Sequence, residues 1–226
     1  MNCEIKGGNF PVAICSMEAG ESLMCETGAM SWMNGGVRME TSTGGGLGKM
    51  LGRAFSGESL FMNRYVADQP GILALSSSSP GEIREIDITG NPIVVQKGSF
   101  LAMDQGVNLD IFFQKKVGTG LFGGEGFIMN KLSGNGKALI EIDGGSVEYQ
   151  LAEGETMTID TGYLVMMDAT CSIDIVMIKG VGNILFGGEG LFNTVVTGPG
   201  RIVLQTQPLT QFAAKIAALM EAFKNK

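Results

Sequence analysis

The sequence predicts an all-β protein in which three tandem repeats form one body, with a single amphipathic helix after them. Three observations predict this fold. A glycine-rich block recurs at intervals of about 65 residues, apolar and polar residues alternate with the period of a β-strand, and the last segment alone has the spacing of an α-helix. The many glycines, 35 in 226 residues, are typical of tight turns between short strands.

A glycine-rich block marks the repeat. Its defining residues are Phe55, Gly57 and Glu58, then Phe122, Gly124 and Glu125, then Phe186, Gly188 and Glu189. The three glutamates lie 67 and 64 residues apart. Two glycines eight residues apart recur in the same register, at Gly20 and Gly28, Gly90 and Gly98, and Gly154 and Gly162. These landmarks predict repeats at 1–75, 76–140 and 141–206, followed by a tail at 207–226.

Alternating apolar and polar residues predict the strands within the repeats. The alternation is clearest over 107–114, 138–143 and 147–151, and a period of two is typical of a strand with one face in a core. Turn-forming residues interrupt the pattern at 68–71, 76–80, 133–136 and 198–200. Because repeats this short rarely bury their apolar faces alone, we expect them to share one core.

The segment 208–224 follows a helical pattern. Its apolar residues recur at steps of three and four, and they are Leu209, Phe212, Ala213, Ile216, Leu219, Met220 and Phe223. This spacing predicts an amphipathic helix with Pro208 in its first turn. We expect its apolar face to cover the end of the β body or to form a subunit contact. The polar face is mixed rather than basic, which argues against a helix lying on a membrane.

Charge and composition exclude several partners and locations. The net charge is −7, with 16 basic residues scattered among 23 acidic ones, so the chain lacks the basic patch that nucleic-acid binding needs. It shows no secretory signal and no apolar run long enough to span a membrane. Cys3, Cys15, Cys25 and Cys171 show no paired spacing. We therefore predict a cytoplasmic protein with reduced thiols.

Few residues are candidates for catalysis or cofactor binding. The chain has no histidine, which excludes histidine-dependent catalysis and histidine metal sites. Gly118, Gly120 and Gly123 match the dinucleotide-binding spacing, but a strand pattern begins at Phe127, where that motif needs a helix. We predict no cofactor and no enzymatic activity.

Three carboxylates remain as site candidates. Glu58, Glu125 and Glu189 occupy equivalent positions, so they could ring a pseudo-threefold axis and bind a cation through oxygen ligands. Alternatively, each accepts backbone hydrogen bonds in its glycine-rich turn or is solvated. The 15 methionines follow strand spacing, which favours core packing over soft-metal binding. Trp32 fits either a core position or an anchor at a subunit interface.

The blocks at 122–127 and 186–192, the stretch at 28–33 and the repeat length resemble the altered-inheritance-of-mitochondria family over residues 1–206. The resemblance implies β-sandwich-like units similar to the subunit of the tryptophan-RNA-binding attenuation protein. It also implies a homotrimer in which nine units form a pseudo-ninefold ring. Mitochondrial relatives are associated with inner-membrane organisation and respiratory assembly, and the family has no established catalytic residues. Ser56 and Ser59 replace motif glycines, so a site shared by all copies would be altered in the first.

We therefore expect a bacterial, non-enzymatic structural or interaction protein that assembles with itself as a homotrimer. Another protein or a membrane-associated complex is the further partner that the resemblance implies. RNA binding does not follow from the resemblance, because a fold does not carry its function with it and this chain is acidic. The alternative is a β protein that binds a small molecule or cation at a repeat or subunit junction.

Overall fold

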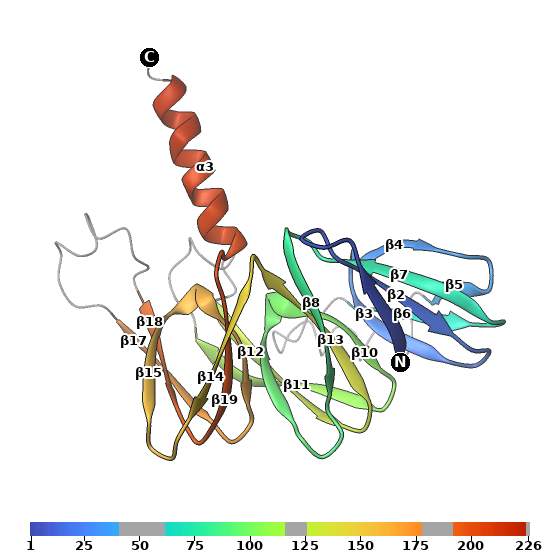
Figure 1. Cartoon of the computed structure of the whole chain (residues 1–226), viewed down its shortest axis with the longest axis horizontal. Helices are drawn as coiled ribbons and strands as arrows, with labels where there is room; N and C mark the ends of the chain where they lie inside the picture. Colours follow the sequence, from blue (N-terminus) through green and yellow to red (C-terminus); the bar gives the residue numbers. More distant parts are fainter. Residues whose placement is uncertain (41–61, 116–125, 178–191, 225–226) are drawn as a thin grey trace, which may run out of the picture.

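The computed structural model describes residues 1–40, 62–115, 126–177 and 192–224. In these residues, antiparallel strands form several sheets, and one long helix follows the last strand (Figure 1). The all-β class and the C-terminal helix that the sequence predicts are therefore confirmed.

Each unit contributes six strands among the described residues. Unit one contains β2 (Val12–Met17), β3 (Ser22–Glu26), β4 (Met30–Met33), β5 (Val37–Glu40), β6 (Met62–Ala67) and β7 (Gly71–Ser76), preceded by β1 (Asn2–Lys6). Unit two contains β8 (Gly81–Asp87), β9 (Ile93–Gln96), β10 (Phe100–Asp104), β11 (Val107–Lys115), β12 (Phe127–Gly134) and β13 (Lys137–Asp143). Unit three contains β14 (Ser146–Leu151), β15 (Thr156–Asp160), β16 (Leu164–Asp168), β17 (Ser172–Met177), β18 (Phe192–Thr197) and β19 (Gly200–Gln205). Two 3₁₀ turns, η1 (Lys97–Ser99) and η2 (Thr161–Tyr163), precede β10 and β16, and α3 spans Leu209–Lys224.

The strands of every unit pair in the same order. The first, sixth and third strands form one sheet, and the fourth, fifth and second form another. The predicted turns at 68–71, 133–136 and 198–200 join the fifth and sixth strands of each unit, and the turn at 76–80 joins unit one to unit two. Apolar side chains of the two sheets meet between them and form the core, as an antiparallel sandwich requires.

The turn between the first and second strands contains an equivalent glycine in each unit. Gly20, Gly90 and Gly154 have φ angles of 89°, 74° and 74°. An L-residue with a side chain rarely adopts this left-handed region, so glycine is the residue that suits the turn. The first glycine of the pair that recurs in the sequence thus marks the same backbone conformation three times.

The second strand of one unit pairs with the third strand of the next. β3 pairs with β10, with Cys25 opposite Ala102, and β9 pairs with β16, with Val95 opposite Met166. We call these pairings the first joint and the second joint. They make sheets continuous across the units, and buried side chains from neighbouring units pack in common clusters. The described core thus consists of three clusters, each built from the buried side chains of two neighbouring units.

The burial of individual strands follows the predicted alternation with exceptions. In β11, Val107 is buried and the residues between the apolar positions are exposed. Met166 and Met167 are fully buried, as expected of core methionines. Val147 and Tyr149 are exposed, because β14 is the outer strand of its sheet.

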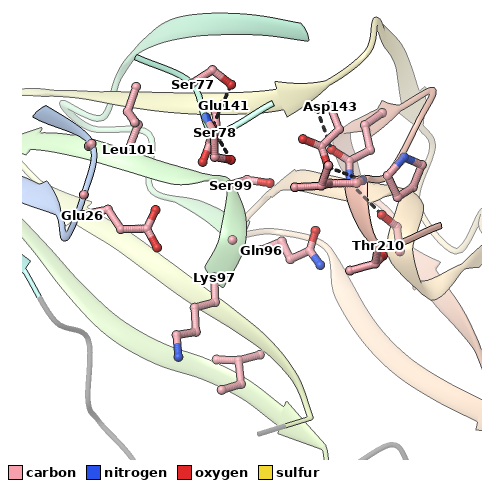
Figure 2. Close-up of a pocket in the computed structure, with 18 of the residues that line it drawn as sticks. Glu26, Ser77, Ser78, Gln96, Lys97, Ser99, Leu101, Glu141, Asp143 and Thr210 are labelled. Carbon is pink, nitrogen blue, oxygen red and sulfur yellow. Dashed lines mark hydrogen bonds between the residues drawn. The ribbon is translucent and has the colours of Figure 1, made fainter. Parts of the chain in front are cut away.

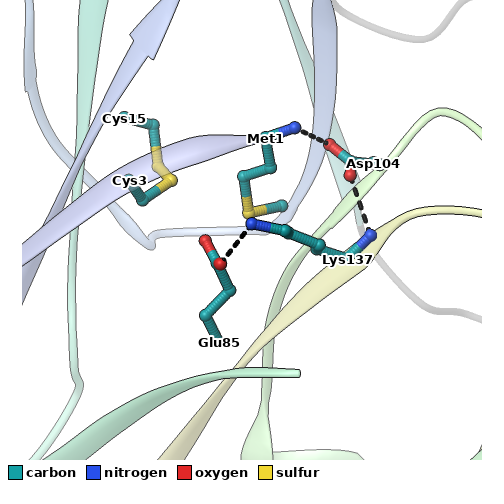
Figure 3. The surroundings of a disulfide bond; sticks show 6 residues. All are labelled: Met1, Cys3, Cys15, Glu85, Asp104 and Lys137. Atoms are coloured by element: carbon teal, nitrogen blue, oxygen red, sulfur yellow. Dashed lines mark hydrogen bonds and ion pairs between the residues drawn. A yellow bond between two sulfur atoms is a disulfide. The ribbon is translucent and has the colours of Figure 1, made fainter. Parts of the chain in front are cut away.

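The prediction of four reduced thiols is wrong for Cys3 and Cys15, which form a disulfide (Figure 3). The pairing of β1 with β2 places these two residues directly opposite each other. Facing residues of an antiparallel pair lie close enough for a disulfide. The two cysteines are 12 residues apart, a separation that brings them together only through the hairpin of β1 and β2. Cys25 and Cys171 are free and buried.

The helix α3 does not cover the end of the β body. It projects away from unit three (Figure 1), and none of its residues is buried. Large apolar side chains on it are open to solvent, including Phe223, which is 74% exposed. The alternative expectation, that this face forms a subunit contact, stays a prediction.

Candidate functional site

The glutamates singled out in the sequence lie outside the described residues. This holds for Glu58, Glu125 and Glu189 and for the rest of the repeat motif, Phe55, Gly57, Phe122, Gly124, Phe186 and Gly188. The ring of carboxylates around a cation therefore stays a prediction. The glycines at 118–123 also lie outside, but the strand that follows them, β12, is present as expected.

A pocket of about 610 Å³ opens where the three units meet. Its lining residues are Glu26, Thr27, Gly28, Ala29, Ser76, Ser77, Ser78, Gln96, Lys97, Gly98, Ser99, Leu101, Gly126, Ile128, Glu141, Asp143, Gly162, Gln205, Pro208, Leu209 and Thr210. The volume lies within the range of small-molecule sites. Figure 2 shows the labelled side chains of Glu26, Gln96 and Ser99 in the space between the strands of neighbouring units.

The two joints place equivalent residues around this pocket. Glu26 ends β3 at the first joint, and Gln96 ends β9 at the second, in the same register to the partner strand. Glu141 in β13 and Gln205 in β19 are likewise equivalent, because each follows the residue that faces the start of β10 or β16. The pocket thus has two carboxylates at the first joint and two amides at the second.

Glu141 is held in place by the loop between units one and two. Its Oε2 atom accepts hydrogen bonds from the Ser77 hydroxyl at 2.8 Å, the Ser78 backbone N–H at 2.6 Å and the Ser78 hydroxyl at 3.0 Å. The side chain is only 4% exposed. Three donors at one oxygen orient the carboxylate and offset part of the cost of burying its charge.

Burial raises the pKa of both carboxylates, and each is also repelled by a neighbouring acidic side chain. Burial, followed by repulsion from Glu141, raises the pKa of Glu26 to about 7, and Lys97 opposes the shift. Burial also raises the pKa of Glu141, against the hydrogen bonds from Ser77 and Ser78. Glu26 therefore exchanges its proton closer to neutral pH than an ordinary glutamate does.

The second joint connects the pocket to the start of α3. Gln205 accepts a hydrogen bond from the Asp143 N–H at 3.0 Å and donates one to the Gly162 carbonyl at 2.8 Å. The Asp143 carboxylate accepts the Leu209 N–H at 2.7 Å, at the first turn of the helix. Gln211 further links the helix to Tyr163 and Asp160. The helix is therefore anchored at the rim of the pocket and free beyond it.

A hydrogen bond from a backbone N–H to a side-chain oxygen also recurs in each unit, beside the joints. Asp104, Asp168 and Asn34 are equivalent, and each accepts a hydrogen bond from the backbone N–H at the start, or second residue, of the sixth strand of its unit. Asp104 also pairs with the N-terminal ammonium of Met1 at 3.0 Å (Figure 3). These contacts tie the ends of the joint strands to their neighbours.

Sequence reasoning missed both glutamates of the pocket. Glu26 and Gln96 lie two residues before the second glycine of the repeated pair, so comparison of that offset could have found the first position. No local signal points to Glu141, because it lies 115 residues from Glu26 and reaches it only through the pairing of β3, β10 and β13.

The thiols offer no reactive alternative among the described residues. Burial raises the pKa of Cys25 to about 12 and also raises that of Cys171, so neither is a thiolate near neutral pH. The described residues also contain no cluster of three or more acidic or cysteine side chains arranged to hold a metal ion.

The chain matches the family described as mitochondrial biogenesis AIM24 over residues 3–207. The chain belongs to this family. An uncharacterized protein of Streptococcus pyogenes serotype M6, M6_Spy0233, is 30% identical over 223 residues, which cover 96% of this chain and 89% of that protein. The crystal structure of SPYM3_0169, also from Streptococcus pyogenes, has a TM-score of 0.82 and 27% identity, covering 96% of this chain and 99% of that one. The predicted family resemblance is confirmed, and AIM24 relatives of this length occur in bacteria.

Within 1–40, 62–115, 126–177 and 192–224, the structure contains no helix with the length and apolar character needed to cross a bilayer.

Proposed function

We propose that this AIM24-family chain is a non-enzymatic assembly protein that forms a closed homotrimeric ring, in which β15 of one copy pairs with β4 of the next. One observation supports this proposal most directly. The same joint occurs twice within the chain, and β15 and β4, the two strands that would form a third such joint, lie at sheet edges. Among the described residues, no strand pairs with the outer edge of β4 or of β15. An unpaired strand edge is a template for pairing with another chain.

The equivalences between units predict the register of this third joint. Ala102 and Met166 correspond to Trp32, and Cys25 and Val95 correspond to Ile159. Trp32 should therefore lie opposite Ile159 of the next copy. The same rule places Met33 opposite Thr158. Trp32 is 47% exposed and Met33 is 36% exposed, which suits apolar side chains that await a partner.

Pairing of this kind is head to tail, because β4 and β15 are different surfaces. Such contacts close into rings when the rotation between copies returns to the start, and otherwise form open filaments. Three copies is the number that the family resemblance implies, and it gives nine units in the ring. A constant rotation at every joint favours closure, since the two internal joints use the same register.

The absence of histidine from the chain and the buried state of the described free thiols support a role without catalysis. Nucleic acid is a poor partner for an acidic chain. The surface of the ring is the feature through which such a protein would hold other proteins or a membrane-associated complex together.

The mass in solution tests the assembly. Light scattering after size-exclusion chromatography should give about 71 kDa, three times the 23.8 kDa of one chain. Trp32→Lys should shift the mass to that of one chain, because a charged residue on the strand edge opposes pairing. Phe10→Lys removes an apolar residue that is 74% exposed and away from both edges, and it should leave the mass unchanged.

Cross-linking tests the register. Met33→Cys combined with Thr158→Cys should produce disulfide-linked trimers, because facing residues on paired strands bring their sulfur atoms together. Met33→Cys with Met157→Cys places the thiols out of register and should link poorly. A wild-type mass of one chain, or linkage that ignores the register, would show that β4 and β15 do not join.

A further inference from the structure

The pocket at the meeting of the units has an asymmetry that the ring does not explain. The four equivalent positions line it, with the carboxylates of Glu26 and Glu141 at the first joint and the amides of Gln96 and Gln205 at the second. Asp143 adds a further carboxylate beside Gln205, where it accepts the Leu209 N–H. At the second joint, amides occupy the same positions of the same backbone arrangement and carry no charge. The carboxylates at the first joint are therefore not needed to build the joint.

Burial destabilises the ionised forms of Glu26 and Glu141, and an added positive charge would offset part of that cost. Glu141 keeps 4% of its surface exposed and is oriented by the loop at 77–78. Charged groups buried near one another are stabilised when an opposite charge joins them. Lys97 offsets part of the negative potential at Glu26, and Asp143 adds to the negative potential at Glu141.

We propose that this pocket binds a small organic cation, a primary amine with further hydrogen-bonding groups, whose ammonium lies between Glu26 and Glu141. Hydroxyl and amide groups of Ser76, Ser99 and Gln96 line the remaining polar wall, and Leu101 and Ile128 line an apolar part. The pocket can therefore receive a polar chain that follows the ammonium toward the second joint. The site lies within one chain, so it does not depend on the ring.

A metal ion fits the pocket less well than an ammonium. Calcium binds six to eight oxygen ligands, usually with several carboxylates, and the described residues contain no cluster of three such side chains. An ammonium needs three acceptors at hydrogen-bond distance, which two carboxylates and a neighbouring hydroxyl or amide oxygen can supply.

Binding should be coupled to protonation of Glu26. The groups that face Glu26 are Glu141 on β13 and Lys97 on η1. An ammonium favours the ionised carboxylate, so affinity should increase as the pH rises through the range in which Glu26 loses its proton. The ammonium itself stays protonated there, because amines of this kind titrate well above neutral pH.

Putrescine and ethanolamine are the probes, in phosphate buffer and at constant ionic strength, with 1,4-butanediol as the uncharged counterpart of putrescine. At millimolar concentration at least one amine should raise the melting temperature of the full chain by mass action, and butanediol should not. Calorimetry should show that Glu26→Gln with Glu141→Gln weakens binding by about tenfold or more. Glu18→Gln with Glu153→Gln makes the same charge change at exposed positions and should keep the affinity.

Three results would overturn the proposal. These are no shift with either amine, equal binding by the double variant, or a calcium response that the same variant abolishes while amines have no effect. If the double variant does not fold, Glu26→Gln alone serves instead, because Glu26 is only partly buried. None of these results depends on oligomeric state, so failure of the ring and failure of the site are distinguishable.

Discussion

The two joints between units share a backbone arrangement and differ in charge. At the first joint, Glu26 and Glu141 face the pocket, and at the second, Gln96 and Gln205 occupy the same positions. The strand register is the same at both, because backbone hydrogen bonds and apolar side chains determine it. The polar side chains at the strand ends are therefore free to differ, and this difference is the basis of the amine site that we propose at the first joint.

The largest effect should come from the shared apolar frame. Leu139 and Val203 are equivalent and fully buried, one beside each joint. Leu139→Ala should lower the free energy of unfolding by about 2–5 kcal/mol, and Val203→Ala by less, because it deletes fewer buried methyl groups. Urea unfolding followed by circular dichroism measures both changes.

Val176→Ala is the control for these core variants, because Val176 is 39% exposed and should change stability little. Val203→Ala could instead lower the free energy of unfolding much more than Leu139→Ala does. The buried side chains beside the two joints would then contribute differently to stability, and the joints would not be equivalent.

An intermediate effect should come from the charge difference. The folded-state pKa of Glu26 is about 7, above the ordinary value of 4.5, so the folded state binds this proton more tightly. The resulting stability is present below about pH 4.5 and is lost as the pH rises to about 7. In the Glu26→Gln variant, the free energy of unfolding should no longer fall by about 2 kcal/mol over that range. This value is smaller than the full pKa shift implies, because Glu26 keeps some solvent contact.

Melting temperatures across this pH range, compared between wild type and Glu26→Gln, measure the loss. Gln96→Glu is the mirror variant, since it introduces a carboxyl group at the second joint. It should create a smaller loss of the same sign, because Gln205 stands there in place of Glu141. Identical pH profiles for wild type and Glu26→Gln would contradict the raised pKa.

The smallest effect should come from the hydrogen bonds at the ends of the joint strands. Asp104 accepts the Lys137 N–H at 2.8 Å, and Asp168 accepts the Arg201 N–H at 2.8 Å. Replacing either with alanine should cost about 1 kcal/mol, the usual net value of one such bond. Thermal unfolding of the two variants should give similar shifts. A much larger loss for Asp104→Ala would mean that its pairing with the Met1 ammonium contributes substantially at the first joint.

Local patterns in the sequence were sufficient for the elements. The alternation at 107–114 predicted β11, the turn residues at 133–136 predicted the connection from β12 to β13, and the steps of three and four predicted α3. These features succeed because strand pleat, turn geometry and helical periodicity depend on neighbouring residues. The candidate site was not predicted, since Glu26 and Glu141 meet only through three strands distant in sequence.

The same limit explains the errors. Cys3 and Cys15 pair because β1 lies against β2, and the spacing of cysteines along the chain does not show which strands are neighbours. The helix α3 was expected to cover the end of the β body or to form a subunit contact, and it does not cover the body: its first turn is held at Asp143 and the rest projects away. A periodic pattern identifies the apolar face of a helix, but it does not identify the surface that buries this face.

The sequence by itself determined that this chain is a threefold repeat of β strands with a helix at its end, because repeat and periodicity are local and linear. Only the tertiary structure decided which strands join the units, which edges remain open, and which side chains share a pocket. Those relations arise from pairing between distant strands. A carboxylate at one joint and an amide at the next can occupy the same place in the backbone arrangement. They differ because burying the charge of the carboxylate costs free energy.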